Sequence, residues 1–326
     1  MRPSPPRRGP QHFPVALARP DLGRWLAGNT GVPGAWSFAA PQPGPHVMLV
    51  GLTHGNEIAG GIVLGRLLDS ALRPLRGRLS IVLANLDAFA TFDPNDPIAS
   101  RHLDEDMNRI WCRAVLDGPG DSSELRRARA LRPLVDTADI LLDLHSMLYD
   151  GAPLVLCGQT EKARLLAVAI GAPALVVTDD GHVSGRRLID YRPFADPGCR
   201  RTAVLVEAGY HWAPETVDGM AESVVRLLRL QEMIDTATAR RLFPGPLVPP
   251  QPRLAQVTRT VTAATDDFAF VRDFASGEVI DARNTLIAMD GSAEIRTPYD
   301  RCLLVMPTLA AQKGQTAVRM AKLVEA

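Results

Sequence analysis

Two residues in segment 47–57 have the types and spacing to hold a metal ion. The segment reads VMLVGLTHGNE, so an apolar run is followed by His54 and then by Glu57. One helical turn apart, or on a tight turn from strand to helix, these two side chains can converge on one ion. His145 ends a second apolar run and is a candidate third ligand. Two imidazoles and a carboxylate are a common ligand set of catalytic zinc, so we predict one zinc ion per chain. The alternative is that each histidine is a hydrogen-bonded structural residue at the end of a strand.

Two carboxylates stand near the ends of apolar runs. Asp143 precedes His145 by two positions, and alternate residues of a strand point to one face. We therefore predict that Asp143 orients a ligating histidine, with His54 as its partner, although a strand-end salt bridge is the alternative. Glu207 ends the run VLVE, where a carboxylate needs a partner or a task. Glu207 could be a general base for water, or it could pair with an arginine.

The segment 101–109, RHLDEDMNR, offers groups for a substrate. Arg109 carries a planar fork that can bind a carboxylate through two hydrogen bonds, and the Asn108 amide can add another donor. Arg101 could stabilise the negative charge that develops on an attacked carbonyl oxygen. Each arginine could instead form a solvated ion pair with the acidic residues 104–106.

The elements that must position these residues are predicted to alternate between strands and helices. Buried strands are indicated by the apolar runs 46–53, 79–84, 138–145, 153–158, 174–178 and 202–207. Helices are indicated over 57–70, 161–170 and 214–236, and Asp121 with Glu124 predicts the capped start of another helix that reaches 135. We predict an α/β fold with a mostly parallel, mixed sheet covered by helices. His54, His145 and Glu207 would then share its carboxyl edge.

Four parts are predicted along the chain. Residues 1–45 form an irregular lead-in, in which 31–45 could be an edge hairpin. Residues 46–242 form the α/β domain of a zinc hydrolase, and 243–253 form a linker with five prolines. Residues 254–326 alternate Val-, Thr- and Ile-rich runs with Asp and Gly turns, which predicts a small all-β domain.

Composition excludes several function classes. The 326 residues balance 36 basic against 36 acidic side chains, so no overall field attracts nucleic acid or an anionic membrane. We see no apolar segment long enough to span a bilayer. The four cysteines form no CxxC pair, which argues against a zinc ribbon and a disulfide scaffold. We expect a cytoplasmic protein with a small-molecule substrate and no nucleic-acid or membrane partner. A homo-oligomer stays open.

Taken in order, these motifs resemble those of the succinylglutamate desuccinylase and aspartoacylase family, relatives of the zinc carboxypeptidases. The family's HGNE stands at 54–57, its DLH stands at 143–145, and its late glutamate stands as Glu207 in VEAG. Its arginine, acidic stretch and Asn-Arg pair stand at 101–109. Order and rough spacing agree over 47–209, and members of the family also carry a small β-rich C-terminal domain.

The resemblance implies a mechanism. It implies that His54, Glu57 and His145 bind zinc and that Arg101 polarises the scissile amide carbonyl. Glu207 would take a proton from the attacking water and give it to the leaving amine. The implied reaction is hydrolysis of the amide bond of a small N-acylated amino acid or a related carboxylate.

The resemblance also assigns a substrate side. It implies that Asn108 and Arg109 hold the substrate α-carboxylate, and that Tyr299 of the C-terminal domain lies near the pocket. The motif DLHSM differs from the family's DLHN or DLHT at Ser146, and segment 181–194 matches no specificity segment that we can align. The acyl group and the amino acid therefore stay open.

Two other functions remain in play. A zinc carboxypeptidase would use the same groups on peptide C-termini, and a non-catalytic homologue would bind a metal or ligand without turnover. Glu207 argues against the second, because binding alone does not require it. A serine hydrolase is poorly supported, because GHVSG places Ser184 off the centre of a G-x-S-x-G turn.

Overall fold

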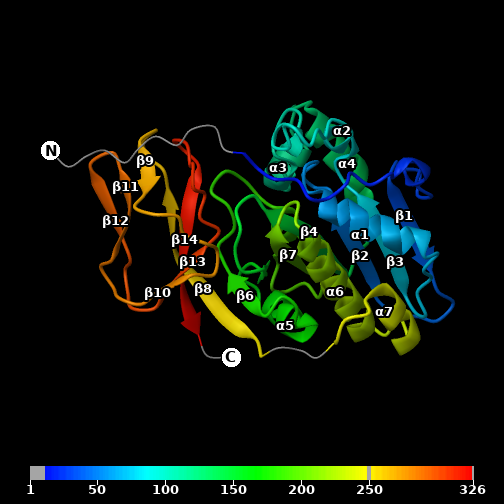
Figure 1. The fold of residues 1–326 in the computed structure, drawn as a ribbon. Coiled ribbons are helices and arrows are strands. Elements are labelled where there is room, and N and C mark those ends of the chain that lie inside the picture. The colour runs from blue at the N-terminus through cyan, green and yellow to red at the C-terminus, as the bar shows by residue number, and fades with distance from the viewer. Residues whose placement is uncertain (1–11, 248–250, 325–326) are drawn as a thin grey trace.

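The computed structural model describes residues 12–247 and 251–324. Within them, strands alternate with helices along most of the chain (Figure 1). The strands are β1 (Ala35–Ala39), β2 (His46–Gly51), β3 (Arg78–Leu83), β4 (Ile140–Met147), β5 (Leu154–Leu156), β6 (Leu175–Thr178), β7 (Thr202–Tyr210), β8 (Arg253–Thr262), β9 (Phe268–Phe270), β10 (Val279–Ile280), β11 (Leu286–Asp290), β12 (Ala293–Arg296), β13 (Cys302–Val305) and β14 (Thr316–Val324).

The helices fall mostly in the first three quarters of the chain. The α-helices are α1 (Ile58–Asp69), α2 (Leu86–Ala90), α3 (Arg113–Leu116), α4 (Ser123–Val135), α5 (Glu161–Ile170), α6 (Pro214–Leu230) and α7 (Thr236–Leu242). The short 3-10 helices are η1 (Gly23–Trp25), η2 (Ala99–Arg101), η3 (Met107–Arg109) and η4 (Leu188–Asp190). No helix in the described ranges is long and apolar enough to cross a membrane.

One mixed sheet of eleven strands runs through the molecule in the order β1-β3-β2-β4-β7-β5-β6-β8-β14-β13-β10. Its centre, β3-β2-β4-β7, is parallel, and β1 pairs antiparallel with β3 at the edge. The predicted fold, a mostly parallel mixed sheet with helices, is therefore confirmed. The segment 31–45 supplies the edge strand β1, and residues 1–11 of the predicted lead-in lie outside the described part.

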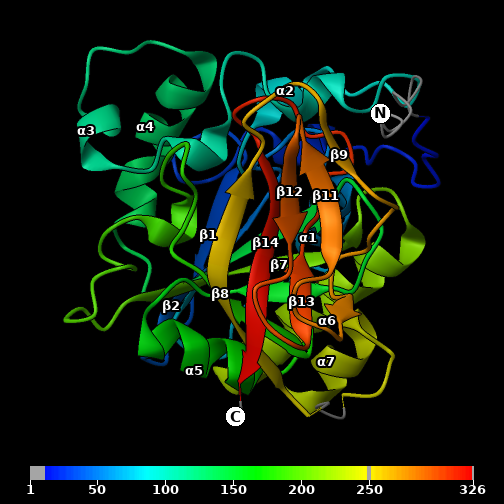
Figure 2. The same cartoon turned by 90° about the vertical axis from the view of Figure 1, so that its left-hand side faces the viewer.

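The C-terminal region is β-rich, as predicted, and its strands extend the same sheet. β8 pairs parallel with β6, and β14 and β13 follow as antiparallel neighbours (Figure 2). A second sheet, β12-β11-β9, lies beyond them. Of the predicted linker, residues 248–250 lie outside the described ranges. The domain boundaries themselves stay predictions from the sequence.

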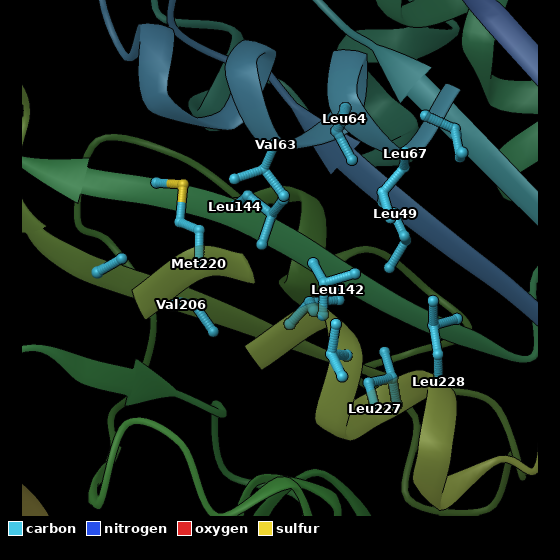
Figure 3. Close-up of a cluster of buried hydrophobic side chains, with 14 of the residues drawn as sticks. Leu49, Val63, Leu64, Leu67, Leu142, Leu144, Val206, Met220, Leu227 and Leu228 are labelled. Carbon is cyan, nitrogen blue, oxygen red and sulfur yellow. The ribbon is translucent and has the colours of Figure 1, made fainter. Parts of the chain in front are cut away.

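Apolar side chains cover both faces of the central strands, which explains why these strands read as continuous apolar runs. On one face, Leu49, Leu142, Leu144 and Val206 of the sheet pack against α1 and α6 (Figure 3). On the other face, their strand neighbours pack against α4 through the fully buried residues Leu125, Ala128, Leu131 and Val135. The two layers fix the strand ends at which the polar residues lie.

Two helix boundaries differ from the sequence prediction. The helix α4 is capped by Ser122, whose hydroxyl accepts a hydrogen bond from Leu125 N, and not by Asp121. The predicted helix 214–236 ends at Leu230, because Glu232 takes a left-handed conformation with φ of 54°, and α7 then starts separately. The Glu124 side chain therefore does not form the predicted capping box and is available for other hydrogen bonds.

Candidate active site

The segment HGNE forms a tight turn between β2 and α1. Glu57 occupies the N-cap position of α1 but its side chain makes no capping hydrogen bond, so the carboxylate is available elsewhere. Gly55 is required here, because a Cβ would lie 2.4 Å from backbone atoms of Ala88 and Phe89. The indole of buried Trp212 donates to the carbonyl of Asn56 at 3.0 Å. These contacts hold the turn rigidly against its neighbours.

The three predicted ligands meet in one buried group, which we call the metal cluster: His54, Glu57 and His145. One candidate ligand atom from each lies within 4.8 Å of the others. Glu57 is central, with Oε1 2.6 Å from His54 Nδ1 and Oε2 3.0 Å from His145 Nδ1. Each residue is at most 3% exposed. Two imidazoles and a carboxylate at such spacing could hold a metal ion.

The surroundings of the metal cluster favour the charged forms of its members, an anionic Glu57 and a cationic His145. Burial alone would raise the pKa of Glu57, but His54 and His145 outweigh it and hold the pKa well below its usual range. Burial alone would lower the pKa of His145, but Asp143 and Glu57 raise it well above its usual value. Because the surroundings stabilise a cation on an imidazole, the same surroundings suit a metal cation.

An irregularity in the pairing of β4 brings a backbone N–H group to the metal cluster. The pairing of β4 with β7 shifts register between His145 and Met147, as at a β-bulge. The N–H of Ser146 donates to Glu57 Oε2 at 3.1 Å. The ladder defect thereby holds the central carboxylate in place.

Asp143 supports a histidine other than the one predicted. Its Oδ2 lies 2.8 Å from His145 Nε2, and its Oδ1 accepts a hydrogen bond from the Thr53 hydroxyl at 3.0 Å. The predicted pairing with His54 is therefore wrong. The reason is local, because Asp143 and His145 are alternate residues on one face of β4.

Asp106 takes the position beside His54 that was predicted for Asp143. Its Oδ1 lies 2.9 Å from His54 Nε2, and its Oδ2 accepts a hydrogen bond from Arg101 at 2.9 Å. Arg109 Nη2 lies 3.5 Å from the same oxygen. Burial alone would raise the pKa of Asp106, but His54, Arg101 and Arg109 outweigh it and hold the pKa far below its usual range. The sequence prediction treated this residue only as an ion-pair partner and missed its place in the site.

The segment 101–109 is held in shape by Glu124. This buried carboxylate accepts hydrogen bonds from the backbone N–H groups of Leu103, Asp104 and Glu105 at 2.7, 3.1 and 3.2 Å. Gly55 N also donates to the carbonyl of Arg101 at 3.1 Å. The loop that carries Arg101 is therefore tied to both α4 and the HGNE turn.

Asn108 and Arg109 both reach the cavity. The amide oxygen of Asn108 accepts a hydrogen bond from Leu188 N at 2.8 Å, which leaves its amide nitrogen 3.5 Å from His145 Nε2. Arg109 donates to the carbonyl of Asn108 at 2.7 Å. Burial lowers the pKa of Arg109 to about 10 although Asp106 opposes this, and the group remains a cation at neutral pH.

Glu207 faces the metal cluster from β7. It stands opposite His145 in the β4–β7 register and is 6% exposed. Its Oε2 is buried and has no hydrogen-bond partner among the described residues. Burial first, and the charge of Glu57 second, raise the pKa of Glu207 to about 8. Among the described residues, no arginine forms an ion pair with Glu207, which was the alternative prediction.

A cavity of about 530 Å³ joins these groups, which is within the usual size of a small-molecule site. The metal cluster, Arg101, Arg109 and Glu207 all line it. Its remaining wall includes His182 and Arg187 from segment 181–194, and residues 306–308, 314–316 and Arg319 from the C-terminal region.

Tyr299 is not brought to this cavity. Its hydroxyl lies 2.6 Å from the Thr258 hydroxyl, and its ring packs beside the apolar cluster of the C-terminal region. In segment 181–194, Tyr191 is buried against α4, where its hydroxyl contacts Arg132 and Asp136, so it also points away from the cavity.

More than half of the chain matches a known protein family. Residues 43–230 match the model of the succinylglutamate desuccinylase/aspartoacylase catalytic domain. The chain belongs to this family. The match covers the metal cluster, the segment 101–109 and Glu207, and the resemblance seen in the motifs is thereby confirmed. The succinylglutamate desuccinylase/aspartoacylase family is one of deacylases. A comparison with curated proteins gives no significant match.

Solved structures share the family fold. A succinylglutamate desuccinylase from Vibrio parahaemolyticus is 18% identical, with a TM-score of 0.66 over 89% of this chain and 86% of that chain. A succinylglutamate desuccinylase/aspartoacylase from Rhodobacter sphaeroides is 18% identical, with a TM-score of 0.62 over 90% and 89%. The ectoine utilization protein EutE (DoeB) from Ruegeria pomeroyi, a product-bound structure, is 18% identical, with a TM-score of 0.60 over 88% and 87%. Identities this low show the fold alone.

Three further side chains line the cavity although the sequence prediction did not place them among the site residues: Ser146, His211 and Arg319. The Ser146 hydroxyl lies 2.7 Å from Nδ1 of His211, and both residues line the cavity. Burial lowers the pKa of His211 to about 3, so its ring is neutral. Arg319 is an arginine within the apolar run AVRMA of β14. The same signal, a charge inside an apolar strand, had pointed to Glu207.

Proposed function

We propose that the protein is a zinc-dependent hydrolase that cleaves the amide bond of a small N-acylated amino acid or a related carboxylate. One observation carries this proposal. Three ligands converge on one point, and beside them stands Glu207, a buried carboxylate oxygen with no hydrogen-bond partner in the described residues. A site that only stored a metal would not need the second feature.

One zinc ion per chain would be held by His54, Glu57 and His145. The donor set, the burial and the stabilisation of positive charge support this assignment. When bound, zinc lowers the pKa of a water molecule and polarises a carbonyl group. Asp143 would fix the ring of His145, and Asp106 would fix the ring of His54.

Glu207 would act as the general base. Glu207 lines the cavity beside the cluster, where its carboxylate can take a proton from the attacking water and give it to the leaving amine. Arg101 would stabilise the negative charge that develops on the amide oxygen. Its guanidinium is already oriented by Asp106 at 2.9 Å, so little reorganisation is needed.

The substrate carboxylate would bind to Asn108 and Arg109. Both residues line the cavity, and of the two only Arg109 has a planar guanidinium that can form two parallel hydrogen bonds with a carboxylate. The α-carboxylate would lie on the side of the cluster that carries the segment 101–109. The amide carbonyl would then lie between Arg101 and Glu207.

A small substrate suits the cavity better than a peptide. The segments 306–308 and 314–316 of the C-terminal region form part of its wall, and its volume of about 530 Å³ is within the usual size of a small-molecule site. This favours a deacylase over the zinc carboxypeptidase alternative. A cytoplasmic location and the oligomeric state stay predictions from the sequence.

A screen of zinc-loaded protein tests the proposal. N-acetyl, N-succinyl and N-formyl amino acids are assayed beside short peptides, and zinc is measured in wild type, His54→Ala and His145→Ala. We expect hydrolysis of N-acyl amino acids, about one zinc per wild-type chain, and loss of zinc in both variants. Peptide cleavage alone would favour the carboxypeptidase, and full zinc content in both variants would refute the ligand assignment.

A further inference from the structure

His211 and Ser146 form a buried side-chain pair that the proposed mechanism does not use. The Ser146 hydroxyl lies 2.7 Å from His211 Nδ1, and the two residues are 3% and 2% exposed. Ser146 directly follows His145 on β4, and His211 directly follows the last residue of β7. The pair therefore joins the end of β7 to the part of β4 that carries a proposed zinc ligand.

The strand pairing beside this pair is irregular. Positions 207 and 210 of β7 pair with positions 145 and 147 of β4, so β7 places two residues opposite Ser146. One of the two is Gly209, whose φ of 124° lies in a region that favours glycine. A bulge of this kind interrupts the ladder of backbone hydrogen bonds. Other contacts must therefore hold the backbone of β4 at this point.

His211 supplies two such contacts. Its backbone N–H donates to the carbonyl of Met147 at 2.9 Å, and its Nδ1 contacts the Ser146 hydroxyl. The N–H of Ser146 in turn donates to Glu57 Oε2 at 3.1 Å. The backbone that follows His145 is therefore held on one side by His211 and on the other side by the central carboxylate of the metal cluster.

Trp212, the next residue, supports the other side of the metal cluster. Its indole donates to the carbonyl of Asn56 in the HGNE turn at 3.0 Å. Its ring lies edge-on to the ring of His211, with the centroids 5.2 Å apart, and the residue is fully buried. The two residues that follow β7 thus contact both segments of the chain from which the proposed ligands come.

From these contacts we infer that His211 is a positioning residue of the metal site, which acts through Ser146. It holds the backbone after His145 in the conformation that directs this ring and the Glu57 carboxylate to one ion. The inference rests on the zinc site of the proposed function and adds a residue outside the ligand set. Replacing a residue that orients metal ligands commonly weakens metal binding by about 10- to 100-fold.

Two other roles of His211 compete with this one. Because His211 lines the cavity, its second ring nitrogen, Nε2, could contact a substrate. In that case its replacement would change the kinetics and leave zinc affinity unchanged. The buried ring could also serve stability alone. Its replacement would then lower the free energy of unfolding, again without a change in the zinc affinity of the folded protein.

Zinc affinity separates these roles and is measured by competition between the metal-free protein and a chromophoric chelator. Ser146→Ala removes only the hydroxyl and should raise the dissociation constant of zinc by about 10- to 100-fold. His211→Ala should have a similar effect, and the double variant should add little, because either change breaks the same contact. Fully additive effects would mean that His211 does not act through Ser146.

Ser80→Ala is the matched control. The Ser80 hydroxyl lies 2.8 Å from Nε2 of His46, so the variant also breaks a buried contact between a serine and a histidine. His46 begins β2, at the end of the strand away from the HGNE turn. Ser80→Ala should therefore bind zinc as wild type does. An equal loss of zinc affinity in Ser80→Ala and Ser146→Ala would overturn the inference.

Two conservative variants identify the ring nitrogen that acts. An Asn side chain places its amide group near the position of Nδ1, whereas a Gln side chain reaches the position of Nε2. His211→Asn should keep zinc affinity within about 3-fold of wild type, and His211→Gln should lose it as Ser146→Ala does. Affinity that is retained by His211→Gln and lost by His211→Asn would overturn the inference.

Two further measurements complete the test. The visible absorption of the cobalt-loaded protein reports the arrangement of the ligands, and it should change in Ser146→Ala but not in Ser80→Ala. Urea unfolding of the metal-free proteins measures stability separately. If His211→Ala does not fold, Ser146→Ala and the Asn and Gln variants still decide. Lower stability with unchanged zinc affinity in Ser146→Ala and His211→Gln would assign the pair to stability alone.

Zinc binding needs no turnover, so this test is separate from that of the proposed function. If zinc binds but no N-acyl amino acid is hydrolysed, the proposed function fails and the titration still decides on His211. If hydrolysis is found and Ser146→Ala binds zinc as wild type does, the inference fails alone. A wild-type protein that binds no zinc would overturn both.

Discussion

Two buried groups of charged side chains border the same cavity and differ in how completely they are hydrogen-bonded. Arg187, Asp179 and Asp190 form the first group, which we call the arginine network, and all four oxygens of the two aspartates accept hydrogen bonds from Arg187. In the metal cluster, two imidazoles converge on Glu57, and the adjacent Glu207 keeps an oxygen without a partner in the described residues. A fully hydrogen-bonded network of this kind stabilises the fold, whereas a buried group without a partner is available to bind another group.

Glu207→Gln tests the unpartnered carboxylate beside the metal cluster and has the largest expected effect. Hydrolysis by zinc-loaded protein should fall by about 10²- to 10⁴-fold, because an amide cannot accept the proton of the attacking water. Zinc content should stay unchanged, since Glu207 is not a ligand. The exposed Glu215→Gln on α6 is the matched control and should keep full activity. An active Glu207→Gln enzyme would remove Glu207 as the base.

The same variant has a stability signature in metal-free protein. The pKa of Glu207 is raised to about 8 in the folded state, so the folded state binds this proton more tightly than the unfolded state does. Wild-type stability should therefore fall as pH rises from about 4.5 towards 8, and this fall is absent in Glu207→Gln. Urea unfolding across this range measures the difference, and parallel curves for the two proteins would contradict it.

The positions of the residues around the metal cluster could largely be predicted from the sequence, because each follows an apolar run. His54, His145 and Glu207 meet since their strands are parallel neighbours whose carboxyl ends share an edge. Which carboxylate contacts which histidine could not be predicted from the sequence. Whether Asp143 or Asp106 contacts His54 depends on side-chain directions and on a loop path that Glu124 fixes from far along the chain.

The C-terminal region shows the same limit at the level of the sheet. Its short strands and turns predicted β structure, but not that β8 would pair with β6 and continue the central sheet. Strand pairing over such a distance in sequence leaves no periodic signal in either strand. Arg319 reaches the cavity only through this pairing, so no motif could assign it.

Arg187→Met tests the arginine network. Removing this guanidinium leaves two buried aspartates without their partner, which should cost about 3–5 kcal/mol of unfolding free energy. Urea unfolding of the metal-free protein measures it. Arg192→Met is the control, because Arg192 pairs with Asp196 on the surface and its replacement should leave stability unchanged. A small loss in both variants would mean that the arginine network is not a structural element.

The pH dependence of the arginine network should run opposite to that of Glu207. Burial alone would raise the pKa of Asp179, but Arg187 outweighs it and lowers the pKa below 3.8. The stabilisation is therefore complete above the unfolded pKa and is lost as pH falls through the lower folded value. The stability difference between wild type and Asp179→Asn should shrink as pH falls below about 4. A constant difference down to pH 2 would contradict this assignment.

Tyr299→Phe carries the smallest expected effect and sharpens the role of the C-terminal region. The family resemblance placed a tyrosine at the pocket, but the Tyr299 hydroxyl is engaged with Thr258, away from the cavity. Removing it should cost less than about 1 kcal/mol of stability and leave KM for N-acyl amino acids unchanged. A raised KM in Tyr299→Phe would mean that the C-terminal region rearranges on substrate binding to bring this hydroxyl into the cavity.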